Sequence, residues 1–180
     1  NLLANTLPRF GITTTFVDPD NPNEFTKAVK SNTRLFFAES LGNPKLDVID
    51  LKSISDASKK AKVPFIVDNT VASPALLNPI EHGAAIVIHS LTKYIGGHGT
   101  AVAGSIVDSG NFDWTADKKR QPLFNEPDAS YGGAVWGEVV PQLTGANVAF
   151  AVRARVCLLR DLGAPLAPDN AWGIIQGLET

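Results

Sequence analysis

The feature that most constrains the fold is a pair of short apolar runs that show no alternation. Phe65–Val67 and Ala84–Ile88 are hydrophobic at every position, as expected of strands buried on both faces. Leu35–Ala38 is a similar run, and Asp50 is a good N-cap for a helical pattern over residues 51–62. The order strand, helix, strand with short connections predicts an α/β chain with a mostly parallel sheet flanked by helices on both faces.

The remaining elements follow from similar patterns. Thr13–Val17 is β-branched and aromatic, and Val102–Val107 also has the pattern of a strand. Residues 108–134 are polar and rich in turn formers, so we expect a long irregular segment there. Further helical stretches are predicted at residues 23–30, 135–162 and from about residue 168 onward.

Composition excludes several classes of protein. The 180 residues carry a net charge of −2 and are 44% hydrophobic, so we expect a globular chain with neither a nucleic-acid nor a membrane partner. A single cysteine excludes an internal disulfide framework and favours the cytoplasm. The chain begins with Asn and contains no Met, which indicates a fragment, a processed chain or an incomplete sequence of a longer protein.

Ligands of parallel sheets bind beyond the carboxyl ends of the strands. Asp68 follows one buried run and Lys93 follows the next, 25 residues later. Either residue alone could just as well have a structural role, because an Asp often stabilises a turn and a Lys after a strand is often simply exposed. Together, a lysine that forms a Schiff base and an Asp that pairs with a pyridinium nitrogen make the basic apparatus of a pyridoxal 5′-phosphate (PLP) enzyme. Nearby hydroxyls, from Ser90 and Thr92, suit a phosphate group.

Other interpretations of the same residues remain weaker. A phospho-receiver signalling module also has an Asp, a Ser/Thr and a Lys at strand ends, but it needs an acidic pair after its first strand and usually a Pro where this chain has Tyr94.

The three histidines lack the spacing of a metal site, so no metal is expected. Cys157 lies among apolar residues and is interpreted as a packing residue. The run 118–120 is interpreted as a solvated loop.

A longer stretch carries a family resemblance. His89–Gly99 (HSLTKYIGGHG) is similar to the lysine segment of the Cys/Met-metabolism family of PLP enzymes, and other motifs agree with it: Glu39–Pro44, Val67–Thr70 and Arg160–Gly163. Within the family, the segments 79–83, 107–114, 124–131 and 176–180 most resemble the branch that acts on O-acetylhomoserine. The resemblance covers essentially the whole chain. It implies the PLP-dependent transferase fold type I, the fold of aspartate aminotransferase.

The resemblance also implies roles for individual residues. Lys93 would form the Schiff base with the cofactor and act as acid and base, and Asp68 would pair with the pyridinium nitrogen. The remaining cofactor contacts would be to the phosphate, the phenolic oxygen and the ring face, made respectively by Ser90 and Thr92, by Asn43 and by Thr70. The implied reaction is γ-replacement on O-acetyl-L-homoserine by sulfide, which gives L-homocysteine and acetate. Cystathionine γ-synthase and methionine γ-lyase activities are alternatives in the same family.

The resemblance further implies that the site is divided. Residues 1–165 would be the central part of a large PLP-binding domain, and residues 166–180 would lead to a C-terminal domain. The phosphate-binding glycine turn and the ring-stacking aromatic would precede Asn1, and the arginine for the substrate carboxylate would follow Thr180. We therefore expect little or no turnover from these 180 residues alone. The whole enzyme would be a cytoplasmic homotetramer, a dimer of dimers. The acyl group and the sulfur donor are left open by the sequence.

Overall fold

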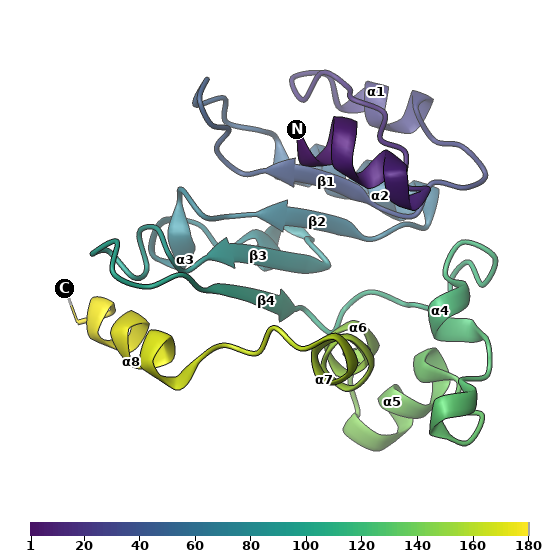
Figure 1. Ribbon diagram of the computed structural model, residues 1–180. Coiled ribbons are helices and arrows are strands. Elements are labelled where there is room, and N and C mark those ends of the chain that lie inside the picture. Colours follow the sequence, from purple (N-terminus) through teal and green to yellow (C-terminus); the bar gives the residue numbers. More distant parts are fainter. Residues whose placement is uncertain (180) are drawn as a thin grey trace.

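Four strands form one sheet in the computed structural model, which describes residues 1–179 (Figure 1). Their order is β1 (Phe36–Glu39), β2 (Phe65–Asp68), β3 (Ile86–Ser90) and β4 (Gly104–Asp108). The first three strands are parallel, and β4 runs antiparallel to β3. The prediction of a mostly parallel sheet is therefore confirmed. None of the described helices is long and apolar enough to cross a membrane.

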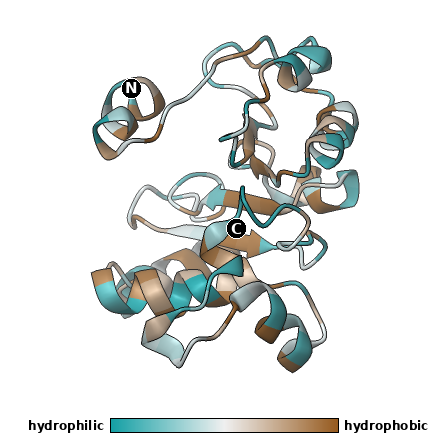
Figure 2. Cartoon of the chain, turned by 90° about the vertical axis from the view of Figure 1, so that its right-hand side faces the viewer, coloured by the Kyte–Doolittle hydropathy of each residue, from teal (hydrophilic) through white to brown (hydrophobic). Residues whose placement is uncertain are grey.

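The central strands bury both faces because their side chains alternate between two hydrophobic cores. Phe65, Val67 and Val87 belong to the first core, whereas Ile66 and Ile86 belong to the second. Figure 2 shows these strands in brown between the helices. The continuous apolar runs in the sequence thus have a direct cause, since a strand with a core on each side has no solvent face.

Two helices cover the first face. They are α1 (Pro22–Lys27) and α2 (Leu51–Ala61). The predicted cap of α2 is present, because the Asp50 carboxylate accepts a hydrogen bond from the Ser53 N–H at 3.0 Å. Ile54, on the inner side of this helix, is completely buried. The helix ends with Lys62 in the left-handed conformation, directly before the chain enters β2.

The second face is covered by short helical elements around an aromatic cluster. The rings of Trp114 and Phe124 lie 4.3 Å apart, and Phe150 stacks on Trp114 at 5.5 Å. The segment 108–134, predicted to be irregular, contains only the short turns α4 (Pro122–Asn125) and η4 (Ala129–Tyr131). The predicted helical region after residue 135 is divided into four elements: α5 (Trp136–Thr144), α6 (Ala149–Arg153), the π-helix η5 (Ala154–Leu159) and α7 (Arg160–Leu162).

Two helices, α3 (Ser73–Leu76) and α8 (Pro168–Gly177), lie toward the side at which β1, β2 and β3 end (Figure 1). The short 3₁₀ helix η3 (Pro79–His82) comes between α3 and the start of β3. The start of α8 at Pro168 agrees with the sequence pattern, since Pro is favoured in the first turn of a helix. This helix contacts the connection between β3 and β4.

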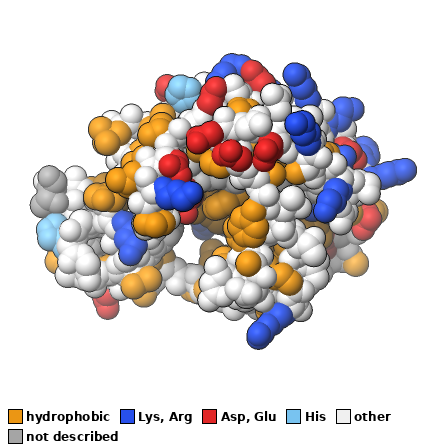
Figure 3. All heavy atoms as spheres, turned by 90° about the horizontal axis from the view of Figure 1, so that it is seen from above, with side chains coloured by type: hydrophobic (Ala, Val, Ile, Leu, Met, Phe, Trp, Pro, Cys, Tyr) orange, Lys and Arg blue, Asp and Glu red, His pale blue; other side chains and the backbone are white. Residues whose placement is uncertain are grey.

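Two local predictions were wrong. The run at residues 35–38 is not wholly buried, because β1 is an edge strand and Phe37 is 38% exposed. Thr13–Val17 forms no strand. It belongs to an N-terminal arm with two short helical elements, η1 (Leu2–Thr6) and η2 (Leu7–Phe10), which contain no buried residue. Figure 2 shows this arm standing away from the sheet, and Figure 3 shows hydrophobic side chains around a hollow in the upper face.

The first core gives a direct test of the packing. We expect Ile54→Ala to lower the free energy of unfolding by about 2–5 kcal/mol, because it leaves a cavity where no solvent reaches, and Ile54→Val by only about 0.5–1.5 kcal/mol. Lys52→Ala, an exposed position on the same helix, is the control and should change stability by less than about 0.5 kcal/mol. Denaturant unfolding of the full-length protein measures all three. Equal effects at positions 52 and 54 would contradict the packing.

Candidate functional site

The register of the parallel strands places the predicted site residues along one edge of the sheet. Glu39 is paired with Asp68, and Asp68 is paired with Ile88. The carboxyl ends of the three parallel strands therefore lie side by side, and the residues that follow them are close to α3 and α8 (Figure 1). All six predicted site residues lie on these strand ends or in the loops that follow them.

A row of hydrogen bonds joins four of the six. The Thr70 N–H donates to Asp68 Oδ1 at 2.9 Å. The Thr70 hydroxyl accepts from the Ser90 N–H at 2.8 Å. The Lys93 N–H in turn donates to the Ser90 carbonyl at 3.2 Å. Thr70, predicted to line the cofactor, thus has a second function, because it fixes the Asp68 carboxylate relative to the strand end that precedes Lys93.

The lysine lies in the loop that connects β3 to β4. Its side chain is exposed, and its Nζ forms no hydrogen bond or ion pair within residues 1–179. The backbone around it is fixed, since the Gly97 N–H donates to the Lys93 carbonyl at 2.7 Å. The neighbouring Thr92 hydroxyl donates to the Ala103 carbonyl at 3.1 Å and accepts from the Ala103 N–H at 2.9 Å. Thr92 therefore holds the two ends of the loop together.

Asn43 lies in the loop after β1. Its backbone N–H donates to Glu39 Oε2 at 3.0 Å, which folds the loop back on the end of the strand. Its side chain is exposed, and the side-chain amide has no protein partner within the described part of the chain. The amide is therefore available to a ligand at the same edge as Asp68.

The sequence interpretation missed the importance of Asn69. This side chain is fully buried. Its Oδ1 accepts from the Ser40 hydroxyl at 2.7 Å, and its Nδ2 donates to the carbonyls of Ser73 and Leu77 at 3.1 and 2.8 Å. Its backbone N–H donates to the Ile88 carbonyl at 2.9 Å. Asn69 thus joins the ends of three strands. The available signal was an Asn two residues after the apolar run Phe65–Val67, because an amide that follows a buried strand so closely is itself buried and needs such partners.

His89 is the second buried polar residue that the sequence interpretation left without a role. It is 5% exposed, and its Nδ1 is buried with no hydrogen-bond partner among the described residues. Burial lowers the pKa of the imidazole below its ordinary value of 6.5, and the backbone at Asn69 and the charge of Asp68 oppose that shift only in part. The imidazole is thus kept neutral beside the carboxylate of the site.

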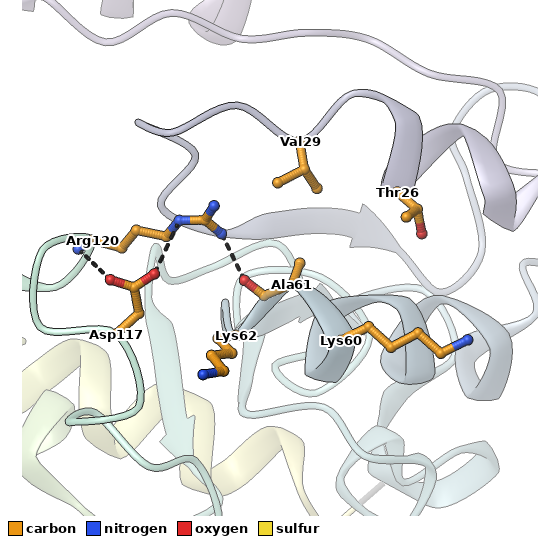
Figure 4. A pocket seen from close by; sticks show the side chains of 7 residues that line it. All are labelled: Thr26, Val29, Lys60, Ala61, Lys62, Asp117 and Arg120. Atoms are coloured by element: carbon orange, nitrogen blue, oxygen red, sulfur yellow. Dashed lines mark hydrogen bonds and ion pairs between the residues drawn. The ribbon is translucent and has the colours of Figure 1, made fainter.

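Two cavities of the described part of the chain lie away from this edge. One, of about 370 Å³, lies at the C-terminal end of α2 between Lys60, Lys62 and Arg120 (Figure 4). The Arg120 guanidinium has protein partners there: Nη1 donates to the Ala61 carbonyl at 2.6 Å, and Nε pairs with Asp117 at 3.3 Å. It caps the helix and attaches the following loop to it. The other cavity, of about 440 Å³, lies along η5.

The groups left without protein partners at the sheet edge match the parts of PLP. Asp68 Oδ2, the Ser90 hydroxyl and Lys93 Nζ form no hydrogen bond within residues 1–179. A carboxylate complements the pyridinium N–H, a hydroxyl complements the phosphate, and a primary amine reacts with the aldehyde. The groups at this edge of the sheet therefore fit the class of PLP-dependent enzymes.

Comparison with known proteins agrees with this class. The family model described as "Cys/Met metabolism PLP-dependent enzyme" matches residues 1–180. An O-acetyl-L-homoserine sulfhydrylase of Leptospira meyeri is 50% identical over the whole chain, and a homocysteine synthase of Schizosaccharomyces pombe is 47% identical. The chain spans 41% of the length of each of these two relatives. It therefore belongs to the Cys/Met-metabolism family of PLP-dependent enzymes.

A solved structure gives the same result for the fold. An O-acetylhomoserine (thiol)-lyase of Campylobacter jejuni, which contains N′-pyridoxyl-lysine-5′-monophosphate, matches 99% of the chain and 42% of its own length. The TM-score is 0.88 at 39% identity. The predicted fold type I is thus confirmed, and the phospho-receiver alternative is wrong. No cluster of three or more possible metal ligands occurs in the described part of the chain.

The buried histidine leads to a prediction about pH. The folded state holds the His89 pKa below its unfolded value, so below about pH 6.5 the unfolded chain binds a proton that the folded chain excludes. Stability should therefore fall as the pH is lowered through this range, and His89→Asn should reduce that dependence. Melting temperatures of the full-length protein between about pH 7.5 and about pH 5.5 measure the effect. The control is His82→Asn, at an exposed histidine, and identical slopes for both variants would contradict the assignment.

Proposed function

We propose that the protein to which this chain belongs catalyses PLP-dependent γ-replacement on O-acetyl-L-homoserine, with sulfide as the nucleophile and L-homocysteine and acetate as the products. The observation that carries the proposal is the hydrogen-bonded row from Asp68 through Thr70 and Ser90 to Lys93. The names of the relatives at 47–50% identity support the choice of sulfhydrylase over cystathionine γ-synthase and methionine γ-lyase.

Each free group at the sheet edge has a part of the cofactor to hold. Asp68 would hold the pyridinium nitrogen, and its negative charge would keep that nitrogen protonated. Ser90 would donate its hydroxyl to the phosphate, and Asn43 would donate its amide to the phenolic oxygen. Thr92 would join Ser90 at the phosphate after its hydroxyl leaves the Ala103 carbonyl, to which it is bonded here. Thr70 positions Asp68 and would line the face of the cofactor.

PLP, when bound, withdraws electrons from the substrate and so makes the protons on Cα and then Cβ acidic. Lys93 Nζ takes the proton from Cα and returns protons later in the reaction, as general base and general acid. Its exposed side chain on a fixed turn suits these proton transfers. The Cγ–O bond breaks with release of acetate, and sulfide forms the new Cγ–S bond. The net change at Cγ is the replacement of one acetyloxy group by one thiol group.

Three wider features belong to the same proposal. Residues 1–165 form the central part of the cofactor domain, and residues 166–180 begin the connection to a C-terminal domain. The whole enzyme is a cytoplasmic homotetramer built as a dimer of dimers, and these 180 residues alone have little or no turnover. The family assignment supports these features.

Chemical trapping of the cofactor tests the central claim. The full-length protein is incubated with PLP, reduced with borohydride and mapped by peptide mass. We expect a phosphopyridoxyl group on Lys93 and none there in Lys93→Arg, because the guanidinium is not a nucleophile. Lys62→Arg, at an exposed lysine away from the site, is the control and should leave the Lys93 label unchanged. Sulfhydrylase activity of the same preparation is measured with O-acetyl-L-homoserine and sulfide.

Absence of the label from Lys93, or labelling spread over many lysines, would contradict the assignment of the cofactor site. Specific labelling together with activity on another substrate of the family would leave the cofactor site intact but contradict the proposed reaction.

The carboxylate gives an independent prediction. We expect Asp68→Asn to lower kcat on the order of 10²–10³-fold, because an amide cannot stabilise the positive charge on the ring nitrogen. Asp68→Glu keeps the charge and should lose less. Steady-state kinetics at saturating PLP, with the bound cofactor measured by absorbance, separates loss of chemistry from loss of binding. A kcat for the Asn variant equal to that of the wild type would contradict the role of Asp68.

A further inference from the structure

The last helix packs against the loop that carries the lysine. Several contacts join α8 to residues 91–103. Asn170 Nδ2 donates to the Val102 carbonyl at 3.0 Å. Gly173 lies over Ala101, and Gly177 lies directly against the backbone of Gly96. Figure 1 shows α8 beside this loop, at the edge where the parallel strands end.

The contact between the two glycines is too close for any side chain. A Cβ added to Gly177 would lie 2.6 Å from the carbonyl carbon of Gly96 and 2.8 Å from its Cα, and closer still to its oxygen. A Cβ added to Gly96 would lie 2.7 Å from Ile174 Cδ1. The partners of Gly177 are backbone atoms, so no side chain can rotate to make room, and an added methyl group must displace the loop.

The displaced loop is the one that fixes Lys93. The Gly96 N–H donates to the Leu91 carbonyl at 2.8 Å, and the Gly97 N–H donates to the Lys93 carbonyl at 2.7 Å. These two bonds close a tight turn with Lys93 inside it. The turn has one side against α8, where Ile174 is 6% exposed. The position of the turn therefore depends on how closely the helix backbone can approach it.

We propose that Gly177 is a positioning residue for Lys93: the close backbone contact between Gly177 and Gly96 sets the position of the lysine turn relative to Asp68. The proposal rests on the proposed function for its effect on turnover, but the effect on the turn itself is independent of cofactor and substrate. It assigns to α8, which contains none of the predicted catalytic residues, a direct part in the geometry of the site.

The helix supplies a matched control. Gly173→Ala makes the same chemical change one turn earlier, where the added Cβ would lie 3.6 Å from Ala101 Cβ, an ordinary contact. Both substitutions replace Gly by a better helix former. Faster exchange in Gly177→Ala than in both Gly173→Ala and the wild type therefore reports the contact with Gly96 and not the general effect of alanine in this helix.

Two measurements on the full-length protein test the proposal. Hydrogen–deuterium exchange of the cofactor-free protein should show faster exchange over residues 91–97 in Gly177→Ala than in Gly173→Ala or the wild type. With PLP bound, kcat of Gly177→Ala should fall by on the order of tenfold to a hundredfold, since misplacing a reacting group by about 1 Å has effects of that size. KM should change little, and Gly173→Ala should remain within about twofold of the wild type.

The outcomes separate this inference from the proposed function. Equal exchange over residues 91–97 in the two variants would overturn the inference, whatever the activity. A wild-type protein with no label on Lys93 would overturn the proposed function. The exchange data would still show whether the contact between Gly177 and Gly96 positions the turn. If Gly177→Ala does not fold, Asn170→Ala decides. It removes one bond between α8 and the loop, and it should raise exchange at residues 91–97 and lower kcat by about fivefold. Unchanged values would overturn the inference.

Discussion

The candidate site depends on one buried amide. Asn69 follows β2 directly. Its side chain and backbone bind Ser40 after β1, Ile88 within β3 and carbonyls of the segment that follows β2. An unsatisfied amide in this position would be costly, so the strand ends are stable only when they meet around it. Because Asp68 and Thr70 are its neighbours in sequence, the same interaction fixes the carboxylate. A structural hydrogen-bond network and a functional group are thus combined in three consecutive residues.

This arrangement explains why the proposed catalytic groups can remain without protein partners. The Ser90 N–H donates to the Thr70 hydroxyl, and the Ser90 carbonyl accepts from the Lys93 N–H. The backbone that carries the Ser90 and Lys93 side chains is therefore fixed without a contact from these side chains. The burial of His89 adds a neutral ring next to this edge. Rigid backbone and unpaired polar side chains are the combination that a preorganised binding site requires.

Much of this could be predicted from the sequence, because strands with two buried faces have a strong signal and the lysine segment is specific. Other features depend on tertiary contacts. The exposed face of Phe37 follows from the edge position of β1, which no local pattern reveals. The antiparallel direction of β4 follows from a connection without a crossover helix. The role of Asn69 arises from partners up to 29 residues away, and the contact of Gly177 with Gly96 arises from a helix far along the chain.

The position of α8 after the four strands in the sequence has a consequence for the order of synthesis. A ribosome delivers β1, β2, β3 and the lysine turn well before it delivers Gly177, so the central strands can pair while the turn is still unsupported. On the inference drawn above, the lysine reaches its final position only when the later helix has docked. Pairing of the strands and positioning of Lys93 would then occur at different times during synthesis. A chain truncated before α8 would contain Asp68 at the sheet edge but would lack the contact that positions Lys93.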